Sequence, residues 1–342
     1  MTGGGGRPSR ETMKTTTCSA ACPEEVCDYR FDRADLRADQ RERGISAFMR
    51  IRNGADFLEL TIRSHIDHFD EIVAVYNQCT DATPEILGKL QSEYGDDRLR
   101  VIHYLDRVFP PGSSDHARTP ADSPHSLVNY YNFALASTRY SHATKLDDDH
   151  LAIEDSLARV VAQVREEIDD RSMACFSGLN VFPGPQGELG ISRCDPISGG
   201  GDIGFFRVSD ETYFTRDRRF ERFHRRGIQR YFAGYLYWHL KYLKPELGFR
   251  NYEIANYLTS RYASRQERLQ REPQPIIGLD DLASIRHRRP LSWISSLVSE
   301  KQGIIRDRDA AIAGTFPDHD VWTAIERTVS PTMFALFRAS LL

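Results

Sequence analysis

The 342-residue chain has no excess of basic charge, no long apolar run and no dense cysteine pattern. With 45 Lys and Arg against 49 Asp and Glu, its formal net charge is −4, which gives no reason to expect nucleic acid as a partner. No stretch of sequence approaches the roughly 20 apolar residues that cross a bilayer, and the polar opening lacks the apolar core of a signal peptide. We therefore expect a cytoplasmic protein whose membrane contact, if any, is peripheral at the inner face.

The six cysteines are spread along the chain, unlike those of a small secreted domain held together by disulfides. Cys18, Cys22 and Cys27 lie close together but have no matching second pair of ligands, which argues against a zinc site. With 40% hydrophobic and 27% charged residues, the composition is that of an ordinary globular protein. A chain of this length can form one large domain, alone or with extensions.

Residues 1–43 are predicted to be an extension that precedes the folded domain. Its first part, which opens with TGGGG, has the composition of a disordered segment. The charged stretch DRADLRADQRER predicts a short exposed helix. We expect ordered structure to begin at Gly44.

From Gly44 onwards, short apolar strands alternate with amphipathic helices. Residues 45–51, 71–76 and 99–104 are strand-like, and apolar residues at helical spacing follow the first two. This β-α-β-α-β order predicts a Rossmann-like, parallel sheet with right-handed crossovers. Because ligands bind beyond the carboxyl ends of such strands, we expect functional turns after Ile51, Tyr76, Tyr104 and Leu146.

The rest of the chain is expected to complete this sheet and to cover it. Residues 106–126 lack periodicity and are either a lid or acceptor-facing loop or a tolerated insertion. Residues 173–182 and 203–208 predict two further strands. We assign residues 44–262 to the catalytic α/β domain and 263–342 to a helical C-terminal region. Its amphipathic pieces could pack on the domain, dimerise or lie on a membrane surface.

Three adjacent aspartates, Asp147 to Asp149, follow a predicted strand in the stretch KLDDDHL. In an extended segment Asp147 and Asp149 would share a side and Asp148 would oppose them. Converging carboxylates repel each other unless a cation lies between them, and Mg²⁺ or Mn²⁺ prefers oxygen ligands together with the phosphates of a substrate. An acidic surface turn is the alternative interpretation, but the position after a strand favours a metal site.

The stretch FMRIRNGADFLELTIRSHIDHFDEIVAVYNQCTDATPEIL resembles the opening of family 2 glycosyltransferases and their GT-A-fold relatives. The similar features are a first strand, an Arg/Asn turn, a helix, a second strand and a turn that here reads NQCTDAT. KLDDDH stands about where the family has its DxD motif. The resemblance covers residues 44–151 well and extends more loosely to about residue 262. It implies a GT-A fold, with a mixed, mostly parallel sheet flanked by helices and, here, a helical C-terminal extension.

In that family the DxD carboxylates hold a divalent metal on the diphosphate of a nucleotide-sugar donor. Carried over, the resemblance makes Asp147 and Asp149 ligands of Mn²⁺ or Mg²⁺, with Asp148 beside the donor. It places the nucleoside among residues of the first two strand ends and their turns: Arg50, Arg52, Asn53, Asn77 and Asp81. Many relatives have an acidic residue where Tyr76 and Asn77 stand here, so recognition of the base and ribose is expected to differ.

In several such enzymes a late histidine completes the metal site. In RRGIQRYFAGYLYWHLKYLKPELG the resemblance makes His239 that histidine and lets Lys241 reach the diphosphate. If this segment is a helix, His239 lies on its apolar face and is either a metal ligand or a hydrogen-bonded core residue. Lys241 would face the other way unless the helix ends near Trp238.

Inverting sugar transfer needs a base that takes the proton from the acceptor hydroxyl. The family places an Asp or Glu for this after the strand that corresponds to residues 203–208, but no clear acidic pair stands there. The candidates are Asp202, Asp217 and Glu221, and we prefer Glu221 for its place in RFERF. Each of the three could instead be a solvated surface residue.

Together these features predict a metal-dependent, hexosyltransferase-type glycosyltransferase that acts in polysaccharide or glycoconjugate biosynthesis. It would move a sugar from a UDP- or GDP-linked donor to a saccharide acceptor, free or lipid-linked, with inversion. A sugar-phosphate nucleotidyltransferase is one alternative, although the turn RNGADF lacks the Gly-rich loop that such an enzyme needs after its first strand. The other is a non-catalytic member that binds nucleotide or saccharide.

Overall fold

The computed structural model describes residues 23–167, 169–184, 186–200, 203–216, 221–253, 261–270, 276–282, 299–317 and 320–341. Its main strands are β1 Glu24–Val26, β2 Glu42–Ile51, β3 Glu71–Tyr76, β4 Leu99–Tyr104, β5 Tyr140–Lys145, β6 His150–Ala152, β7 Ser172–Pro183, β10 Gly204–Arg207 and β13 Gln229–His239. Shorter strands are β8 Leu189–Ser192, β9 Ile197–Ser198, β11 Thr212–Arg216, β12 Glu221–Arg225 and β14 Ile276–Ile277. The helices are α1 Leu58–His65, α2 Thr83–Tyr94, α3 Ser114–Arg118, α4 Leu127–Ala136, α5 Glu154–Glu167, α6 Arg261–Gln270, α9 Glu300–Thr315, α10 Val321–Thr328 and α11 Pro331–Ala339.

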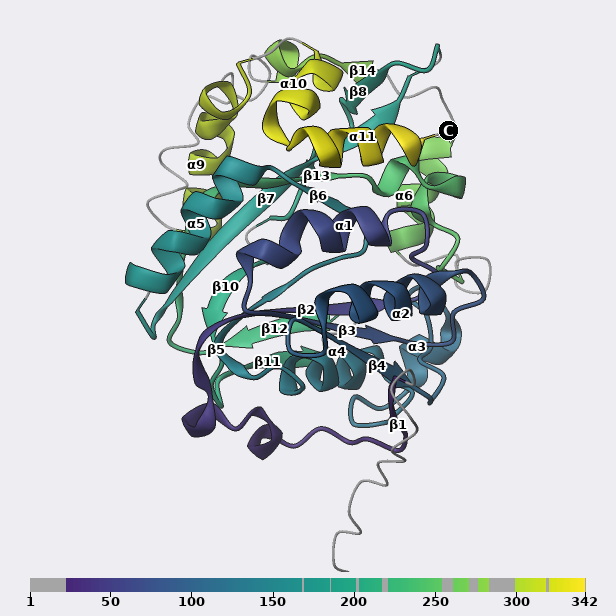
Figure 1. The fold of residues 1–342 in the computed structure, drawn as a ribbon, viewed down its shortest axis with the longest axis vertical. Helices are drawn as coiled ribbons and strands as arrows, with labels where there is room; N and C mark the ends of the chain where they lie inside the picture. The colour runs from purple at the N-terminus through teal and green to yellow at the C-terminus, as the bar shows by residue number, and fades with distance from the viewer. Residues whose placement is uncertain are drawn as a thin grey trace, which may run out of the picture.

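One mixed sheet organises the described part of the chain, in the order β1-β4-β3-β2-β5-β10-β7-β13-β6 (Figure 1). The pairs from β1 through β5 are parallel, with Ser46 opposite Glu71 between β2 and β3. β10 is antiparallel to both β5 and β7, whereas β13 is parallel to β7. Helices flank this sheet, so the predicted mixed, mostly parallel α/β fold is confirmed.

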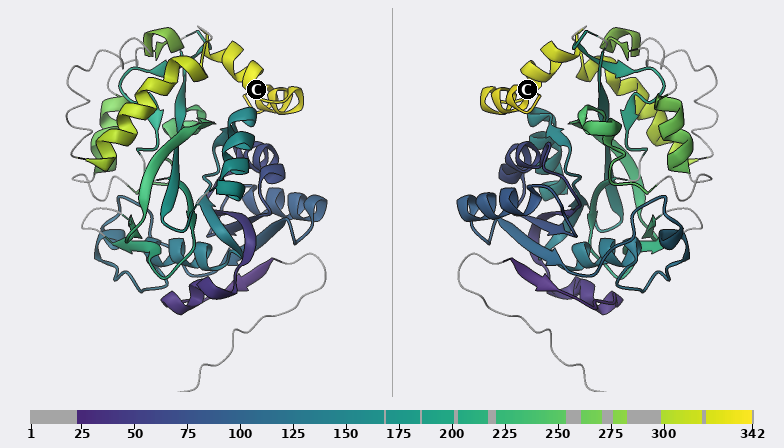
Figure 2. Two further views of the ribbon diagram at one scale, coloured as in Figure 1. Left: turned by 90° about the vertical axis from the view of Figure 1, so that its left-hand side faces the viewer. Right: turned by 90° about the vertical axis from the view of Figure 1, so that its right-hand side faces the viewer.

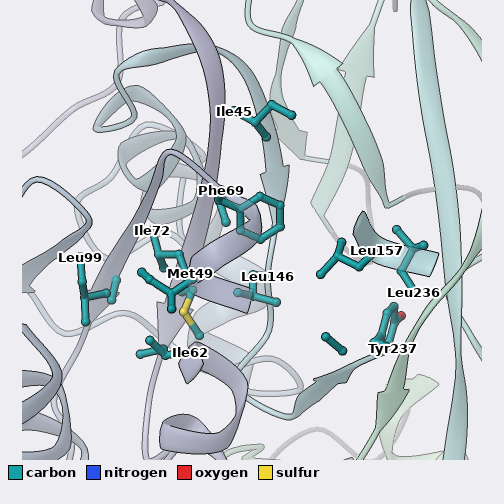
Figure 3. Packing of buried hydrophobic residues seen from close by; sticks show 14 of the residues in the cluster. Ile45, Met49, Ile62, Phe69, Ile72, Leu99, Leu146, Leu157, Leu236 and Tyr237 are labelled. Atoms are coloured by element: carbon teal, nitrogen blue, oxygen red, sulfur yellow. The ribbon is translucent and has the colours of Figure 1, made fainter. Parts of the chain in front are cut away.

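The apolar composition of the first strands explains why they lie in the centre. Every residue of β3 is buried, as expected for a parallel strand covered on both faces. Met49 of β2, Ile72 of β3 and Ile62 of α1 belong to one buried cluster (Figure 3). The helices α1 and α2 therefore bury their apolar faces against the sheet on which the site is built.

The segment around His239 is a strand, β13, and the helix expected there from the apolar spacing is wrong. Aromatic residues such as Tyr235 and Trp238 favour strands, and β13 pairs along its length with β7. Register shifts after Phe232 and Tyr235 interrupt the two-residue alternation. Residues 235–238 are buried in succession, and such an apolar run does not distinguish strand from helix by its periodicity.

The sequence predicted that ordered structure begins at Gly44, but the structure shows ordered elements before this residue. β1 pairs in parallel with β4, and two 3-10 helices follow at Arg33–Leu36 and Ala38–Gln40. The side chain of Leu36 is fully buried in the cluster beneath the sheet. Burial of this apolar residue and the added strand attach the charged stretch to the domain.

The C-terminal helices pack on the second half of the sheet. Ile312 of α9, Ile325 of α10 and Phe337 of α11 belong to a buried cluster with Trp238 of β13. In both views of Figure 2 these helices lie at the end of the molecule remote from β1. The expected domain boundary after residue 262 falls inside α6, and the division into domains stays a prediction. Within the described ranges, no helix is long and apolar enough to span a membrane.

Candidate active site

The carboxyl ends of β2, β3 and β5 meet at one edge of the sheet, as the parallel pairing requires. A cavity of about 280 Å³ opens there. The predicted site residues that line it are Arg50, Arg52, Asn77, Asp147, Asp148, Asp149, Glu221, His239 and Lys241. Asp202 and Asp217 lie outside the described residues.

The three aspartates occupy the turn between β5 and β6 rather than an extended strand end. The predicted alternation, with Asp147 and Asp149 on one side, therefore does not apply. Lys244 Nζ lies 3.2 Å from Asp148 Oδ2 and 2.9 Å from Asp149 Oδ2. Asp147 Oδ2 instead lies 2.7 Å from Lys145 Nζ. Two lysines thus pair with the three carboxylates of this turn, and all five residues line the cavity.

His239 reaches this turn because it ends β13, beside β6. Asn180 of β7 donates its amide Nδ2 to the Asp195 carbonyl, which leaves Asn180 Oδ1 as the acceptor facing His239 Nδ1 at 2.5 Å. Nδ1 must therefore carry a proton that it donates. The other ring nitrogen, Nε2, faces Asp149 Oδ1 at 3.2 Å, so either a proton or a cation must lie between these two atoms.

A second buried histidine completes the cluster. His150 follows the triplet directly, is 1% exposed and stacks on the Tyr237 ring with centroids 3.6 Å apart. Ligand atoms of Asp149, His150 and His239 lie within 4.8 Å of one another. Asp149 Oδ1 and His150 Nε2 are buried and receive no hydrogen bond of acceptable geometry.

These orphaned atoms test whether a divalent cation fits the site. Buried polar atoms are rarely left without a partner, and here a carboxylate oxygen and two imidazole rings bring candidate ligand atoms within 4.8 Å of one another. Mn²⁺ accepts both kinds of donor, and hydrogen bonding of the other ring nitrogen, as in His239 to Asn180, is the usual arrangement of a ligating histidine. The residues present therefore fit a divalent cation.

Burial and neighbouring charges separate the three carboxyl groups. Burial raises the pKa of Asp148 to about 6, against the opposing effect of Lys244. For Asp149, burial is outweighed chiefly by the charge of Lys244, which holds its pKa well below the usual value. For Asp147, burial is outweighed in the same way by Lys145, so its pKa is also lowered. The cluster therefore retains negative charge at neutral pH.

Cationic side chains form the remaining polar wall of the cavity. The Arg50 guanidinium lies 3.1 Å from the centroid of the Tyr131 ring, and its Nε is buried without a hydrogen bond. Lys241 Nζ lies 3.3 Å from the Tyr252 hydroxyl and 4.7 Å from the centroid of the Phe249 ring. This wall provides positive charge close to the acidic turn, which suits an anionic ligand.

The predicted nucleoside residues Asn53, Asn77 and Asp81 have structural partners. Asn77 donates to the carbonyls of Tyr104 and Asp106 and accepts from the Val108 amide, so its amide group holds the loop after β4. Asp81 accepts from the amides of Ala55 and Thr83. Asn53 accepts from the Thr80 amide. Asn53 and Asp81 shape the turns and do not line the cavity.

Asn251 links the 241–252 segment, which lines one side of the cavity, to the turn that follows β2. It donates to the carbonyls of Arg52 and Asn53 and accepts from the Asn53 amide nitrogen Nδ2 at 3.2 Å. The 241–252 segment is thereby held over the end of β2.

Glu221 lies at the start of β12 and reaches the cavity beside the long segment 106–126. Its Oε1 lies 3.3 Å from His116 Nε2 of α3, and its side chain is 10% exposed. Burial lowers the pKa of His116, although Glu221 opposes this. Arg216 holds the same segment by donating to the His116 carbonyl at 2.9 Å. The segment thus supplies a partner to the one predicted base that the structure describes.

Three residues of this site were not among the sequence candidates. His150 had a usable signal, because it directly follows the aspartates in KLDDDHL. Asn180 and Lys244 had none, because nothing in their local sequence connects them with the acidic turn. Only the pairing of β13 with β7 and the turn after β13 bring them there.

No protein-family model and no curated protein matches the chain. Among solved structures, it is similar to Staphylococcus aureus TarS 1–349, at 13% identity and a TM-score of 0.36, over 79% of this chain and 90% of that one. It is also similar to the mannosyltransferase PcManGT from Pyrobaculum calidifontis in complex with GDP-Man and Mn²⁺, at 17% identity and a TM-score of 0.30, over 51% of each chain.

A third similar structure is glucosyl-3-phosphoglycerate synthase from Mycobacterium tuberculosis with Mn²⁺, UDP and phosphoglyceric acid, at 15% identity and a TM-score of 0.27. That match covers 49% of this chain and 53% of the synthase. Each of these TM-scores is below 0.5.

Proposed function

We propose that this protein is a metal-dependent glycosyltransferase of GT-A-like fold that transfers a sugar from a nucleotide-sugar donor to a saccharide acceptor. One observation carries the proposal. Ligand atoms of Asp149, His150 and His239 converge within 4.8 Å, and Asp149 Oδ1 and His150 Nε2 are buried without a hydrogen bond. Asp149 and His239 also line the cavity at the carboxyl ends of the parallel strands, beside cationic side chains. A divalent cation together with a diphosphate matches this combination of donors and charge.

In this proposal Asp149, His150 and His239 hold Mn²⁺ or Mg²⁺. This set of three ligands replaces the pair Asp147 and Asp149 that the sequence predicted. Asp147 remains beside His150, with 3.9 Å between Oδ2 and Nε2. The bound cation would supply Lewis-acid stabilisation of the departing diphosphate. Arg50, Arg52 and Lys241 provide positive charge to the donor, while Asn53, Asn77 and Asp81 hold the turns around the nucleoside.

Glu221 is proposed as the general base. Its carboxylate takes the proton of the acceptor hydroxyl while the hydroxyl oxygen forms a bond to the anomeric carbon. The bond from that carbon to the diphosphate oxygen breaks at the same time, so the nucleoside diphosphate leaves and the configuration inverts. His116, 3.3 Å from Glu221, orients the carboxylate for this step.

The finer assignments are a UDP- or GDP-linked hexose as donor and a saccharide acceptor, free or lipid-linked, in polysaccharide or glycoconjugate synthesis. Residues of the 106–126 segment such as Phe109 and Pro110 line the cavity, and this supports the proposal that the segment faces the acceptor. We place the reaction in the cytoplasm or at the inner face of the membrane.

Release of nucleotide from a panel of UDP- and GDP-sugars, with Mn²⁺ and with EDTA, tests this function. At least one donor should be hydrolysed slowly with Mn²⁺ and not with EDTA. Asp149→Asn should abolish both hydrolysis and the metal-dependent thermal stabilisation by that donor. Glu221→Gln should retain the stabilisation and lose transfer to an acceptor by about 100-fold or more. Stabilisation without turnover by any donor would instead identify a non-catalytic binding protein.

A further inference from the structure

We propose that Lys244 is a tethered counter-ion of the metal site, held by Asp148 and Asp149 until a divalent cation enters and displaces it. The inference rests on the proposed function, because it concerns the same acidic turn. In this inference Lys244 competes with the metal for the carboxylates of the turn. Metal binding should therefore change the conformation of the 241–252 segment that carries Lys244.

The contacts of Lys244 are those of a bound cation. Its Nζ lies 2.9 Å from Asp149 Oδ2 and 3.2 Å from Asp148 Oδ2. The side chains of Lys244, Asp148 and Asp149 are 11%, 17% and 8% exposed. In such a poorly hydrated setting an ammonium group interacts strongly with two carboxylates.

A divalent cation at the neighbouring ligand atoms would compete with this ammonium group. Asp149 offers its second oxygen, Oδ1, to the cluster with His150 and His239. One carboxylate would therefore serve Lys244 and the metal through adjacent oxygens, and two positive centres so close together repel each other. Entry of the metal weakens the Lys244 contact, and removal of Lys244 strengthens the metal contact.

The backbone that follows Lys244 is in an unfavourable conformation. Lys244 lies between two short 3-10 helices, Lys241–Leu243 and Pro245–Gly248, in an extended conformation. Glu246 and Leu247 follow it with φ of 55° and 53°, which is unfavourable for residues with a side chain. Contacts elsewhere must hold these two residues, and we infer that the ion pairs of the adjacent Lys244 contribute to this. Loss of the ion pairs would allow the segment to relax.

Lys241 provides a matched control on the same segment. It lines the same cavity, but its Nζ lies against Tyr252 and Phe249 rather than against a carboxylate. Replacing either lysine by methionine removes one positive charge from the cavity. Only Lys244→Met removes the counter-ion of Asp148 and Asp149.

The test is Mn²⁺ binding to the nucleotide-free full chain, measured from the electron paramagnetic resonance signal of free Mn²⁺. Lys244→Met should bind Mn²⁺ about tenfold more tightly than the parent, the effect expected for removing one competing charge. Lys244→Arg should resemble the parent, and Lys241→Met should change the affinity much less than Lys244→Met. Thermal unfolding should show that Lys244→Met is less stable than the parent in EDTA and regains stability with Mn²⁺.

The outcomes separate this inference from the proposed function. Equal affinity in the parent and Lys244→Met, with binding lost in Asp149→Asn, would overturn the role of Lys244 and leave the metal site standing. An equal gain in Lys241→Met would also overturn it, because general charge would then explain the effect. No Mn²⁺ binding by any variant would overturn both. Tighter binding in Lys244→Met that Asp149→Asn abolishes supports both.

Discussion

At the scale of single residues, the candidate site depends on which atom carries a proton. Asn180 is oriented by the Asp195 carbonyl and so offers an oxygen to His239 Nδ1. This leaves His239 Nε2 as the ring atom that faces Asp149 Oδ1. The arrangement is stable only with a proton or a metal between the two atoms, and a divalent cation uses both lone pairs.

Asn180→Leu should therefore weaken Mn²⁺ binding by about 10- to 100-fold, the range typical for residues that orient a ligating histidine. The substitution removes the acceptor that fixes the His239 ring. Free Mn²⁺ in a titration measures the effect. A matched control is Asn132→Leu, a buried asparagine of α4 that bonds the Phe214 backbone away from the metal cluster. If both variants bound Mn²⁺ as the parent does, Asn180 would have no orienting role.

At the scale of elements, parallel strands and their register determine what meets at the site. Glu71 begins β3 and is fully buried. It accepts from the Ser46 hydroxyl of β2 at 2.7 Å and from the backbone and side chain of Arg139 at 2.6 and 2.9 Å. Because Arg139 immediately precedes β5, this one carboxylate joins the starts of β3 and β5 to the middle of β2, and the carboxyl ends of these three strands carry the site.

Glu71→Ala should lower the free energy of unfolding by about 2–3 kcal/mol, because a buried hydroxyl and an amide lose their acceptor. Urea denaturation of the metal-free protein measures the change. Asp170→Ala, which removes a mostly exposed ion pair with Arg207, should change stability little. Equal effects of the two substitutions would contradict the assignment of Glu71 as a fixed point of the sheet.

At the scale of the whole molecule, the C-terminal helices belong to the same packed body as the sheet. Trp238 of β13 donates its indole N–H to Thr328 Oγ1 of α10 at 2.9 Å, and Phe337 of α11 is fully buried near Trp322. Of the roles open to this region, packing on the domain is the one that these contacts support. β13 also ends at His239, so the same strand that carries the helices carries a ligand of the candidate metal site.

Phe337→Ala should cost about 3–5 kcal/mol of stability, the range for truncating a buried aromatic side chain. Leu341→Ala, at an exposed position near the end of the described residues, should cost less than about 1 kcal/mol. Thermal and urea unfolding would measure both. A small loss in Phe337→Ala would mean that α11 is only loosely attached to the protein.

The unfolding free energy should also depend on pH through His65 of α1. Its ring is buried, which lowers its pKa from 6.5 to about 3, and its Nδ1 lies 2.9 Å from the Thr61 carbonyl. Between these pH values the unfolded chain binds a proton that the folded protein does not. This contribution to stability is therefore present above pH 6.5 and is lost as the pH falls towards 3.

Replacing the ring should reduce this loss. In EDTA, His65→Asn should show a stability–pH slope shallower than the parent by up to about 1.4 kcal/mol per pH unit within that window. Urea denaturation at several pH values gives the slopes. Parallel curves for the two proteins would show that folding does not lower the pKa of His65.

The local sequence predicted much of the sheet and part of the site. Apolar runs such as EIVAVY predicted the central strands. The rule that ligands bind at strand ends predicted a site at the edge of the sheet where Arg50, Arg52 and the aspartates line one cavity. The secondary structure of the residues after about 220 was harder to predict, because the aromatic run of β13 fits a helix as well as a bulged strand. Charge patterning likewise could not reveal that Leu36 is buried among charged neighbours.

What the sequence by itself determined is the alternation of strands and helices and the acidic turn that follows β5, since both depend on neighbours along the chain. The tertiary structure alone decided that Asp149 meets His239, that Asn180 orients that ring and that Lys244 neutralises the turn. These contacts join residues far apart in the sequence through the pairing of β7, β13 and β6. Proximity of this kind arises when strands pair and pack, and no local periodicity encodes it.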